Sequence, residues 1–361
     1  MRRLLVVLTL LAPALFASPA HAGGIAVQPI KTGLAFPAAF TFAPGGKIVY
    51  AERFTGEIRV LDPTTGSDTL FFTVTNVATA GEQGLLGVAL HPQIASGQPF
   101  VYAYATRNTG TGLQNQILRI RIRAGGNHSS SVIFSSDVTP ASIHNGGIIH
   151  FGPDGRLYAQ IGDASNPANA QNLELRAGKI VRMTASGGVP SDNPFVGVAG
   201  DDYLYSYGFR NGYGFTWDPQ TDGPWETQNG PACNDEINKL ERGGNFAWGP
   251  NQTCSGTAPQ NTNQDGPSPR LLPEAFYTPT TAPTGIEFCD GCGLTGSEGH
   301  LFFGEYNTGR IREAVLDAAR DDIVSQTIPI DRPNGILSLA RGPDGGIYFS
   351  DDTGIFKLVN A

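Results

Sequence analysis

The chain has 361 residues, of which 40% are hydrophobic and 16% charged, with 47 glycines, 26 prolines and a formal net charge of −8. This negative balance argues against nucleic acid and anionic membrane surfaces as partners, and the apolar content is too high for a disordered chain. Many glycines and prolines between short β-branched or aromatic runs favour strands joined by tight turns.

The first 22 residues have the pattern of a cleaved export signal. Arg2 and Arg3 precede an apolar run that ends at Leu15, and Ala20-His-Ala22 is a small-x-small cleavage pattern. We therefore expect residues 1–22 to be a signal peptide and the mature protein to be periplasmic or secreted. Loss of the two arginines changes the formal charge from −8 to −10. No later segment approaches ~18 uninterrupted apolar residues, so no membrane insertion is expected.

A turn motif recurs along the rest of the chain. Its clearest copies are Phe42-Ala-Pro-Gly-Gly46, Phe151-Gly-Pro-Asp-Gly155 and Arg341-Gly-Pro-Asp-Gly345, with looser copies near Leu86, Gly214 and Gly285. The copies indicate about six units of four short strands, and radial repetition of such sheets is a β-propeller. We expect residues 23–361 to form a single all-β domain, a six-bladed β-propeller of four-stranded antiparallel blades. A β-sandwich of repeated hairpins is the alternative, and the number and spacing of the units favour the propeller.

The segment from His144 to Asp163 contains one of these turns between two candidate catalytic residues. Pro153 presets φ for the turn and Gly155 takes the positive φ, so a tight hairpin is expected. His144 then lies near the start of one strand and Asp163 near the end of the next, and antiparallel pairing can bring those ends together. A carboxylate in that place would orient the imidazole as a general base. A hydrogen-bonded channel histidine and a strand-end cap are the structural alternatives.

The four cysteines have two interpretations. Export makes disulfides the default, and pairing between neighbours, Cys233 with Cys254 and Cys289 with Cys292, is preferred among three possible connectivities. A zinc site of four thiolates is the alternative, because Cys289-Asp-Gly-Cys292 has ligand spacing, but the chain contains no second CxxC motif.

These motifs together resemble the soluble PQQ-dependent aldose sugar dehydrogenases, the glucose/sorbosone dehydrogenase family. The resemblance covers roughly residues 30–358 and rests on Gln83–Pro92, His144–Asp163, Gly178–Arg182, Pro190–Phe195, Tyr207–Asn211, Asn229–Asn238 and Gly244–Trp248. It implies a propeller enzyme that oxidises the anomeric carbon of aldose sugars to lactones with PQQ and calcium. It also implies a small-molecule sugar substrate and a separate electron acceptor.

The resemblance implies roles for five residues at the quinone. His144 matches the family's base, and Asp163 matches the carboxylate that orients it. Arg210 and Asn211 match the pair at the reactive quinone carbonyl, and Gln83 matches a polar residue beside the cofactor. The roles are chemically consistent, because imidazole accepts a proton and a guanidinium stabilises developing negative charge. Arg210 as the partner of an acidic residue between blades is the alternative.

Three further residues match calcium positions. The carbonyls of Gly230 and Pro231 match ligands of the calcium that activates PQQ, and Glu236 matches an acidic position near a structural calcium. Calcium prefers such hard oxygen ligands. A simple turn is the alternative for the Gly-Pro step.

The chain departs from the family where the three carboxylates of PQQ are normally bound. Asn307 replaces the usual lysine, and Gly335 and Leu337 replace the usual Arg-x-Arg pair. Neither asparagine, glycine nor leucine supplies a charged contact to a carboxylate. Four nearby arginines are candidate replacements, namely Arg310, Arg312, Arg332 and Arg341.

These departures leave a second function open. A non-catalytic propeller would bind carbohydrate or a protein partner at the same mouth, without the cofactor. A hydrolase or lyase that uses His144 and calcium has little support, because no nucleophile motif accompanies the histidine.

Overall fold

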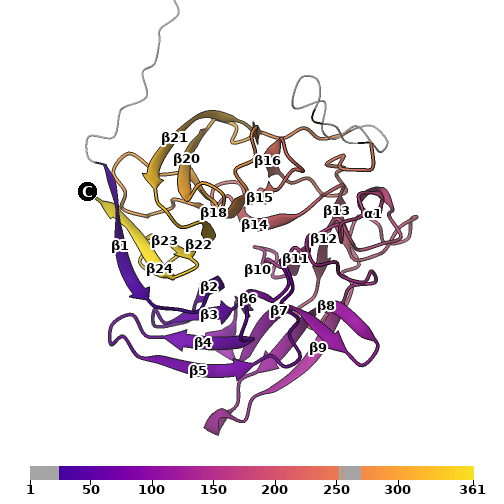
Figure 1. Ribbon diagram of the computed structural model, residues 1–361, viewed down its shortest axis with the longest axis horizontal. Helices are drawn as coiled ribbons and strands as arrows, with labels where there is room; N and C mark the ends of the chain where they lie inside the picture. Colours follow the sequence, from indigo (N-terminus) through magenta and orange to yellow (C-terminus); the bar gives the residue numbers. More distant parts are fainter. Residues whose placement is uncertain (1–23, 252–253, 255–269) are drawn as a thin grey trace, which may run out of the picture.

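Short strands alternate with tight turns along residues 24–251, 254 and 270–361, the part of the chain that the computed structural model describes. The strands form six antiparallel sheets of four strands, arranged as a ring (Figure 1). The expected six-bladed, all-β propeller is therefore confirmed, and the β-sandwich alternative is wrong. The expected signal peptide, residues 1–22, lies outside the described residues.

Each blade runs from an inner strand at the channel to an outer strand. Blade 1 contains β2 (Pro37–Phe42), β3 (Ile48–Glu52), β4 (Glu57–Leu61) and β5 (Asp68–Thr73); blade 2 contains β6 (Leu85–Leu90), β7 (Phe100–Thr109), β8 (Gly112–Arg121) and β9 (Ser129–Ser135). Blade 3 contains β10 (Ile149–Phe151), β11 (Leu157–Ile161), β12 (Lys179–Met183) and β13 (Leu204–Tyr207); blade 4 contains β14 (Gly212–Trp217), β15 (Pro224–Gln228), β16 (Asp235–Lys239) and β17 (Ala275–Tyr277). Blade 5 contains β18 (Pro283–Phe288), β19 (Leu301–Glu305), β20 (Arg310–Leu316) and β21 (Ile323–Asp331); blade 6 contains β22 (Ile336–Arg341), β23 (Ile347–Asp351), β24 (Gly354–Asn360) and β1 (Ile25–Thr32).

Helical structure is sparse in the described chain. It comprises the short helix α1 (Ala168–Gln171) and 3-10 turns at Ile94–Ser96 and Ala124–Gly126. Among the described residues, no helix is both long enough and apolar enough to cross a membrane.

The two ends of the chain meet in blade 6. Strand β1 pairs antiparallel with β24, with Ile25 opposite Asn360 and Val27 opposite Leu358. The first strand thus completes the last sheet and closes the ring, which removes the exposed strand edges that an open array would leave.

The recurring turn motif forms the hairpin between the first two strands of a blade. In blade 3, Ile149 pairs with Ala159, and the turn between them has Gly155 at φ 70°. The Asp154 carboxylate accepts a hydrogen bond of 2.9 Å from the Arg156 amide. The hairpin forms as the sequence predicts, because glycine adopts positive φ without steric cost.

Glycines let the inner strands approach one another around the channel. A Cβ at Gly87 in β6 would lie 2.1 Å from the Gly147 carbonyl oxygen, just before β10. A Cβ at Gly214 in β14 would lie 2.3 Å from the Thr284 carbonyl oxygen in β18, and one at Gly285 would lie 2.1 Å from the Leu339 amide in β22. Any larger residue at these positions would push the blades apart.

Two disulfides add covalent links outside the channel. Cys233 is bonded to Cys254, and Cys289 is bonded to Cys292, which are the pairs preferred from the sequence. The described chain has no free cysteine, so the zinc alternative is wrong because no thiolate remains to bind a metal.

We predict that Gly285→Ala destabilises the propeller by about 3 kcal/mol or more, because the added methyl group meets backbone atoms of β22 that cannot move without displacing a blade. Urea unfolding measures the change. Gly110→Ala is the matched control, since its Cβ would meet no atom within 4 Å. Equal stability of the two variants would contradict the close approach of β18 and β22.

Candidate active site

A cavity of about 490 Å³ lies at one mouth of the channel. Its polar side chains come from segments just before inner strands, such as Glu82 before β6, His144 before β10 and Arg210 before β14. Segments after second strands contribute Arg53 and Asn229. Antiparallel neighbours run in opposite directions, so the start of one strand and the end of the next lie at the same edge of a blade. The fold therefore gathers all these segments at one mouth.

His144 and Asp163 form a buried pair at this mouth. Nδ1 of His144 lies 2.7 Å from Oδ1 of Asp163, which is fully buried. A carboxylate only accepts hydrogen bonds, so Nδ1 carries the ring hydrogen and Nε2 has the free lone pair. His144 also lines the cavity, where it can accept a proton from a bound molecule.

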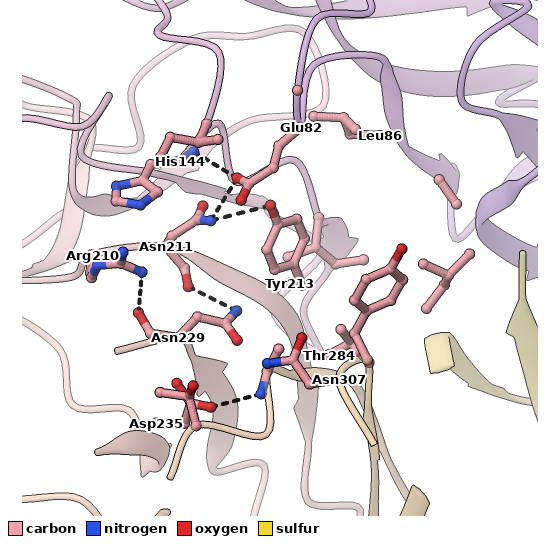
Figure 2. A pocket seen from close by; sticks show the side chains of 18 of the residues that line it. Glu82, Leu86, His144, Arg210, Asn211, Tyr213, Asn229, Asp235, Thr284 and Asn307 are labelled. Atoms are coloured by element: carbon pink, nitrogen blue, oxygen red, sulfur yellow. Dashed lines mark hydrogen bonds between the residues drawn. The ribbon is translucent and has the colours of Figure 1, made fainter. Parts of the chain in front are cut away.

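The backbone of His144 is held in an uncommon conformation. Its φ of 62° lies in the left-handed region that non-glycine residues rarely occupy. The Glu82 carboxylate accepts a 2.6 Å hydrogen bond from the His144 amide, and the Asn211 amide group donates to the same Oε2 atom at 3.0 Å (Figure 2). Glu82 thus connects the histidine to the neighbouring blade.

Asp163 is held in place by hydrogen bonds to groups other than His144. Its Oδ2 accepts a 2.9 Å hydrogen bond from the indole Nε1 of Trp248, and its Oδ1 accepts one of 2.8 Å from the Ser165 amide. Its own amide donates to the Arg210 carbonyl at 2.8 Å. Both carboxylate oxygens therefore have fixed partners, which sets the orientation of the His144 ring. Trp248 lies 85 residues from Asp163, and sequence reasoning did not identify it as part of the site.

Arg210 and Asn211 line the same cavity as His144, and their roles at a quinone carbonyl stay predictions. Arg210 donates from Nη1 to the Asn229 carbonyl at 2.9 Å, and its guanidinium lies 5.6 Å from the centre of the Trp248 ring. Burial lowers the pKa of Arg210, and the negative charges of Asp163 and Glu82 act in the opposite direction. The site thus places one desolvated cation next to the candidate base.

Gln83 does not occupy the position expected for it. Its side chain donates to the Ala141 carbonyl at 2.9 Å and does not line the cavity, whereas the preceding residue, Glu82, does. Glu82 and Gln83 are consecutive residues in the turn segment just before β6, so an error of one residue exchanges the two positions. At this point of the lining the cavity therefore meets the carboxylate of Glu82 and not the amide of Gln83.

Gly230 and Pro231 line the cavity near several oxygen atoms. Asn229 also lines it, and its Oδ1 is buried without a hydrogen-bond partner in the described chain. The Asp235 carboxylate holds this loop by accepting the Gly230 amide at 2.7 Å. No group of three or more His, Cys, Asp or Glu side chains suited to a metal occurs among the described residues. Carbonyl and amide oxygens suit calcium, so the residues present fit this ion.

Glu236 lies outside the cavity. It is buried in β16, where its Oε2 accepts a 2.6 Å hydrogen bond from the Gln228 side chain. Gln228 in turn accepts the Arg210 amide at 2.9 Å. These hydrogen bonds connect Glu236 through Gln228 to the backbone of Arg210. A calcium role for Glu236 stays a prediction.

The positions at which the chain departs from the family lie together. Asn307 and Leu337 line the cavity, and Gly335 is packed against Tyr306, where a Cβ would lie 2.3 Å from the Tyr306 carbonyl oxygen. An arginine at position 335 would therefore require the backbone to move. These observations place two uncharged side chains and a glycine where the family normally has cations.

The four arginines considered as replacements are used elsewhere, and none lines the cavity. Each forms an ion pair: Arg310 with Asp331, Arg312 with Glu305, Arg332 with Asp351 and Arg341 with Asp290. The interpretation that they replace the missing cations is wrong. The described residues that line the cavity include two cations, Arg210 and Arg53.

Glu226 forms a buried polar contact beneath the site. Its carboxylate accepts hydrogen bonds of 2.7 Å from Gln160 and from Asn238. Burial, together with the nearby charge of Glu236, raises the pKa of Glu226 to about 8, although the hydrogen bonds from Asn238 and Gln160 act in the opposite direction. Oε1 of Gln160 has no hydrogen-bond partner in the described chain.

We predict that the folded state loses stability as pH rises toward 8, because folded Glu226 holds its proton to a higher pH than unfolded Glu226. Glu226→Gln should flatten this loss by about 2 kcal/mol or more between about pH 5 and 8. Urea unfolding across that range measures it. Glu241→Gln, at an exposed position, is the control. Parallel pH profiles of wild type and Glu226→Gln would contradict the prediction.

Comparisons with known proteins identify similar sequences and folds. A family model described as "Glucose / Sorbosone dehydrogenase" matches residues 34–359. The aldose sugar dehydrogenase YliI of Escherichia coli is 26% identical over 98% of this chain and 96% of its own, and quinoprotein glucose dehydrogenase B of Acinetobacter calcoaceticus is 28% identical over 61% and 51%. The PQQ-bound aldose sugar dehydrogenase of Streptomyces coelicolor superposes with a TM-score of 0.79 and 27% identity, over 95% of this chain and 100% of that one.

Proposed function

The chain belongs to the glucose/sorbosone dehydrogenase family, and we propose that it oxidises the anomeric carbon of an aldose to a lactone with PQQ and calcium. The hydrogen bond between His144 and Asp163 at the cavity carries this proposal. It supplies a proton acceptor whose orientation is set before a sugar binds. A non-catalytic binder is not favoured, because the His144–Asp163 pair is present and the named relatives are dehydrogenases.

His144 takes the proton in the proposed reaction. Its free Nε2 accepts the hydrogen of the anomeric hydroxyl, and Asp163 stabilises the imidazolium that forms. The Trp248 and Ser165 donors keep the carboxylate in place while the charge appears. The chemistry that PQQ would supply when bound is that of a hydride acceptor for the anomeric carbon.

Arg210 and Asn211 prepare the cavity for negative charge. The Arg210 guanidinium is fixed by the Asn229 carbonyl and the Trp248 ring, so it does not have to reorient when negative charge develops beside it. The carbonyls of Gly230 and Pro231, with Asn229, would hold calcium, which supplies a second positive charge. The cycle would need a separate electron acceptor to reoxidise the cofactor.

We also propose that the protein works outside the cytoplasm. The N-terminal signal pattern and the two disulfides support this location, because disulfides persist in oxidising compartments. N-terminal sequencing of the mature protein tests it, with Gly23 as the expected first residue.

We predict that His144→Ala lowers kcat for dye-linked aldose oxidation by about 10²–10⁴, because the proton acceptor is lost. Circular dichroism should remain unchanged. The matched control is His150→Ala, in β10 of the same blade, because His150 is exposed and does not line this cavity. Equal activity of wild type and His144→Ala would remove His144 from the mechanism.

We predict that PQQ with calcium raises the melting temperature of the apoprotein. A ligand at about 100 times its dissociation constant stabilises the folded state by about 2.7 kcal/mol. Differential scanning fluorimetry compares samples with PQQ, with calcium and with both. The melting temperature should rise most with both, since the oxygen atoms of the cavity would bind calcium while its arginines bind the anionic PQQ. Identical curves in all samples would exclude this cofactor pair.

A further inference from the structure

Arg53 is a cavity cation to which the sequence analysis gave no role. It directly follows β3 in blade 1, and blade 1 contacts blade 6 through β2 and β22. Glu82, Tyr213 and Tyr306 are the titratable groups whose side chains lie near its guanidinium. Tyr306 precedes Asn307 and packs against Gly335. Arg53 therefore lies at the same end of the cavity as the positions where the family's cations are replaced.

The guanidinium of Arg53 is held in a fixed plane. It lies 5.1 Å from the centre of the Phe36 ring and 4.7 Å from that of Phe54. Nε donates to the Gln83 carbonyl at 3.1 Å, and Nη2 donates to the Gly81 carbonyl. Nη1 has no hydrogen-bond partner among the described residues. A planar donor fixed in this way loses little conformational entropy when a carboxylate binds to it.

The surroundings of Arg53 leave its charge available. Glu82 is the nearby carboxylate, but its Oε2 already accepts the amide of His144 and the side chain of Asn211. Burial lowers the pKa of Arg53. The side chain is half-buried and lines the cavity, so an anion bound there can reach the guanidinium.

We propose that Arg53 binds a carboxylate of PQQ and replaces the cations missing at positions 307, 335 and 337. The inference rests on the proposed function, because it assumes that a planar, polyanionic quinone occupies the cavity. In this arrangement a carboxylate of PQQ would bind to a residue of blade 1, and the quinone carbonyls would lie near His144 and Arg210.

The test measures PQQ affinity directly, by quenching of tryptophan fluorescence in the calcium-loaded protein. Arg53→Gln should raise the dissociation constant about 10- to 100-fold, as expected for loss of a hydrogen bond between charged groups. It should also make binding less sensitive to salt. Arg107→Gln is the matched control, because Arg107 is a half-buried arginine that donates to the Thr75 carbonyl and does not line the cavity.

Two further variants separate charge from loop anchoring, because Arg53 also holds the segment that carries Glu82. Arg53→Lys keeps the charge but loses the planar donor, so its affinity should lie between those of wild type and Arg53→Gln. Arg53→Gln combined with Leu337→Arg returns a cation from blade 6 and should restore both affinity and salt sensitivity. Restoration supports the charge role; failure to restore in a folded double variant assigns Arg53 to loop anchoring and overturns the proposal.

The remaining outcomes distinguish this inference from the proposed function. Tight binding by wild type and equally tight binding by Arg53→Gln overturns the role of Arg53 and leaves the quinoprotein proposal intact. Absence of PQQ binding by wild type overturns both.

Discussion

The site depends on the alternation of strand direction within a closed ring. Every inner strand begins at the same mouth, so residues just before β6, β10 and β14 meet residues that follow second strands. Glycines at the inner strands bring the blades close enough for side chains of different blades to contact one another. Glu82 in front of blade 2 can therefore accept the amide of His144 in front of blade 3.

Within this frame the candidate base is held by groups from several blades. The ring of His144 is hydrogen-bonded to Asp163, and its backbone amide is hydrogen-bonded to Glu82. Asp163 in turn accepts a hydrogen bond from Trp248. Arg210 contacts the Trp248 ring, so one indole supports both the carboxylate and the cation. Such mutual support explains how a residue with a left-handed backbone can be held in a single orientation.

Local patterns predicted the fold and the central pair. The repeated Pro-Asp-Gly turns predicted hairpins because φ restrictions act within a few residues, and the hairpin of blade 3 brought His144 to Asp163. Gln83 was misplaced because the choice between adjacent residues depends on which way each side chain points. Trp248 and Arg53 were missed because their roles depend on blades far away in sequence.

The arginines near the departures illustrate the same limit. Arg312 and Arg332 looked available in the sequence, but each has a carboxylate partner, Glu305 and Asp351, within the strands or loops around it. Composition cannot show which of several nearby acids a given cation will meet. Only the register of the strands decides whether a charge faces the channel or the outside of a blade.

The pairing of β1 with β24 has a consequence for the time at which the protein becomes functional. Blade 6 needs strands from both ends of the chain, with Ile25 opposite Asn360. A nascent chain can form blades 1 to 5 in order, but the channel stays open at one seam until its last residues have been made and delivered. Leu337, which lines the cavity, belongs to this last blade. Under the proposed function, cofactor loading would therefore follow the pairing of β1 with β24, and truncation near the C-terminus would leave a set of blades without a finished cavity.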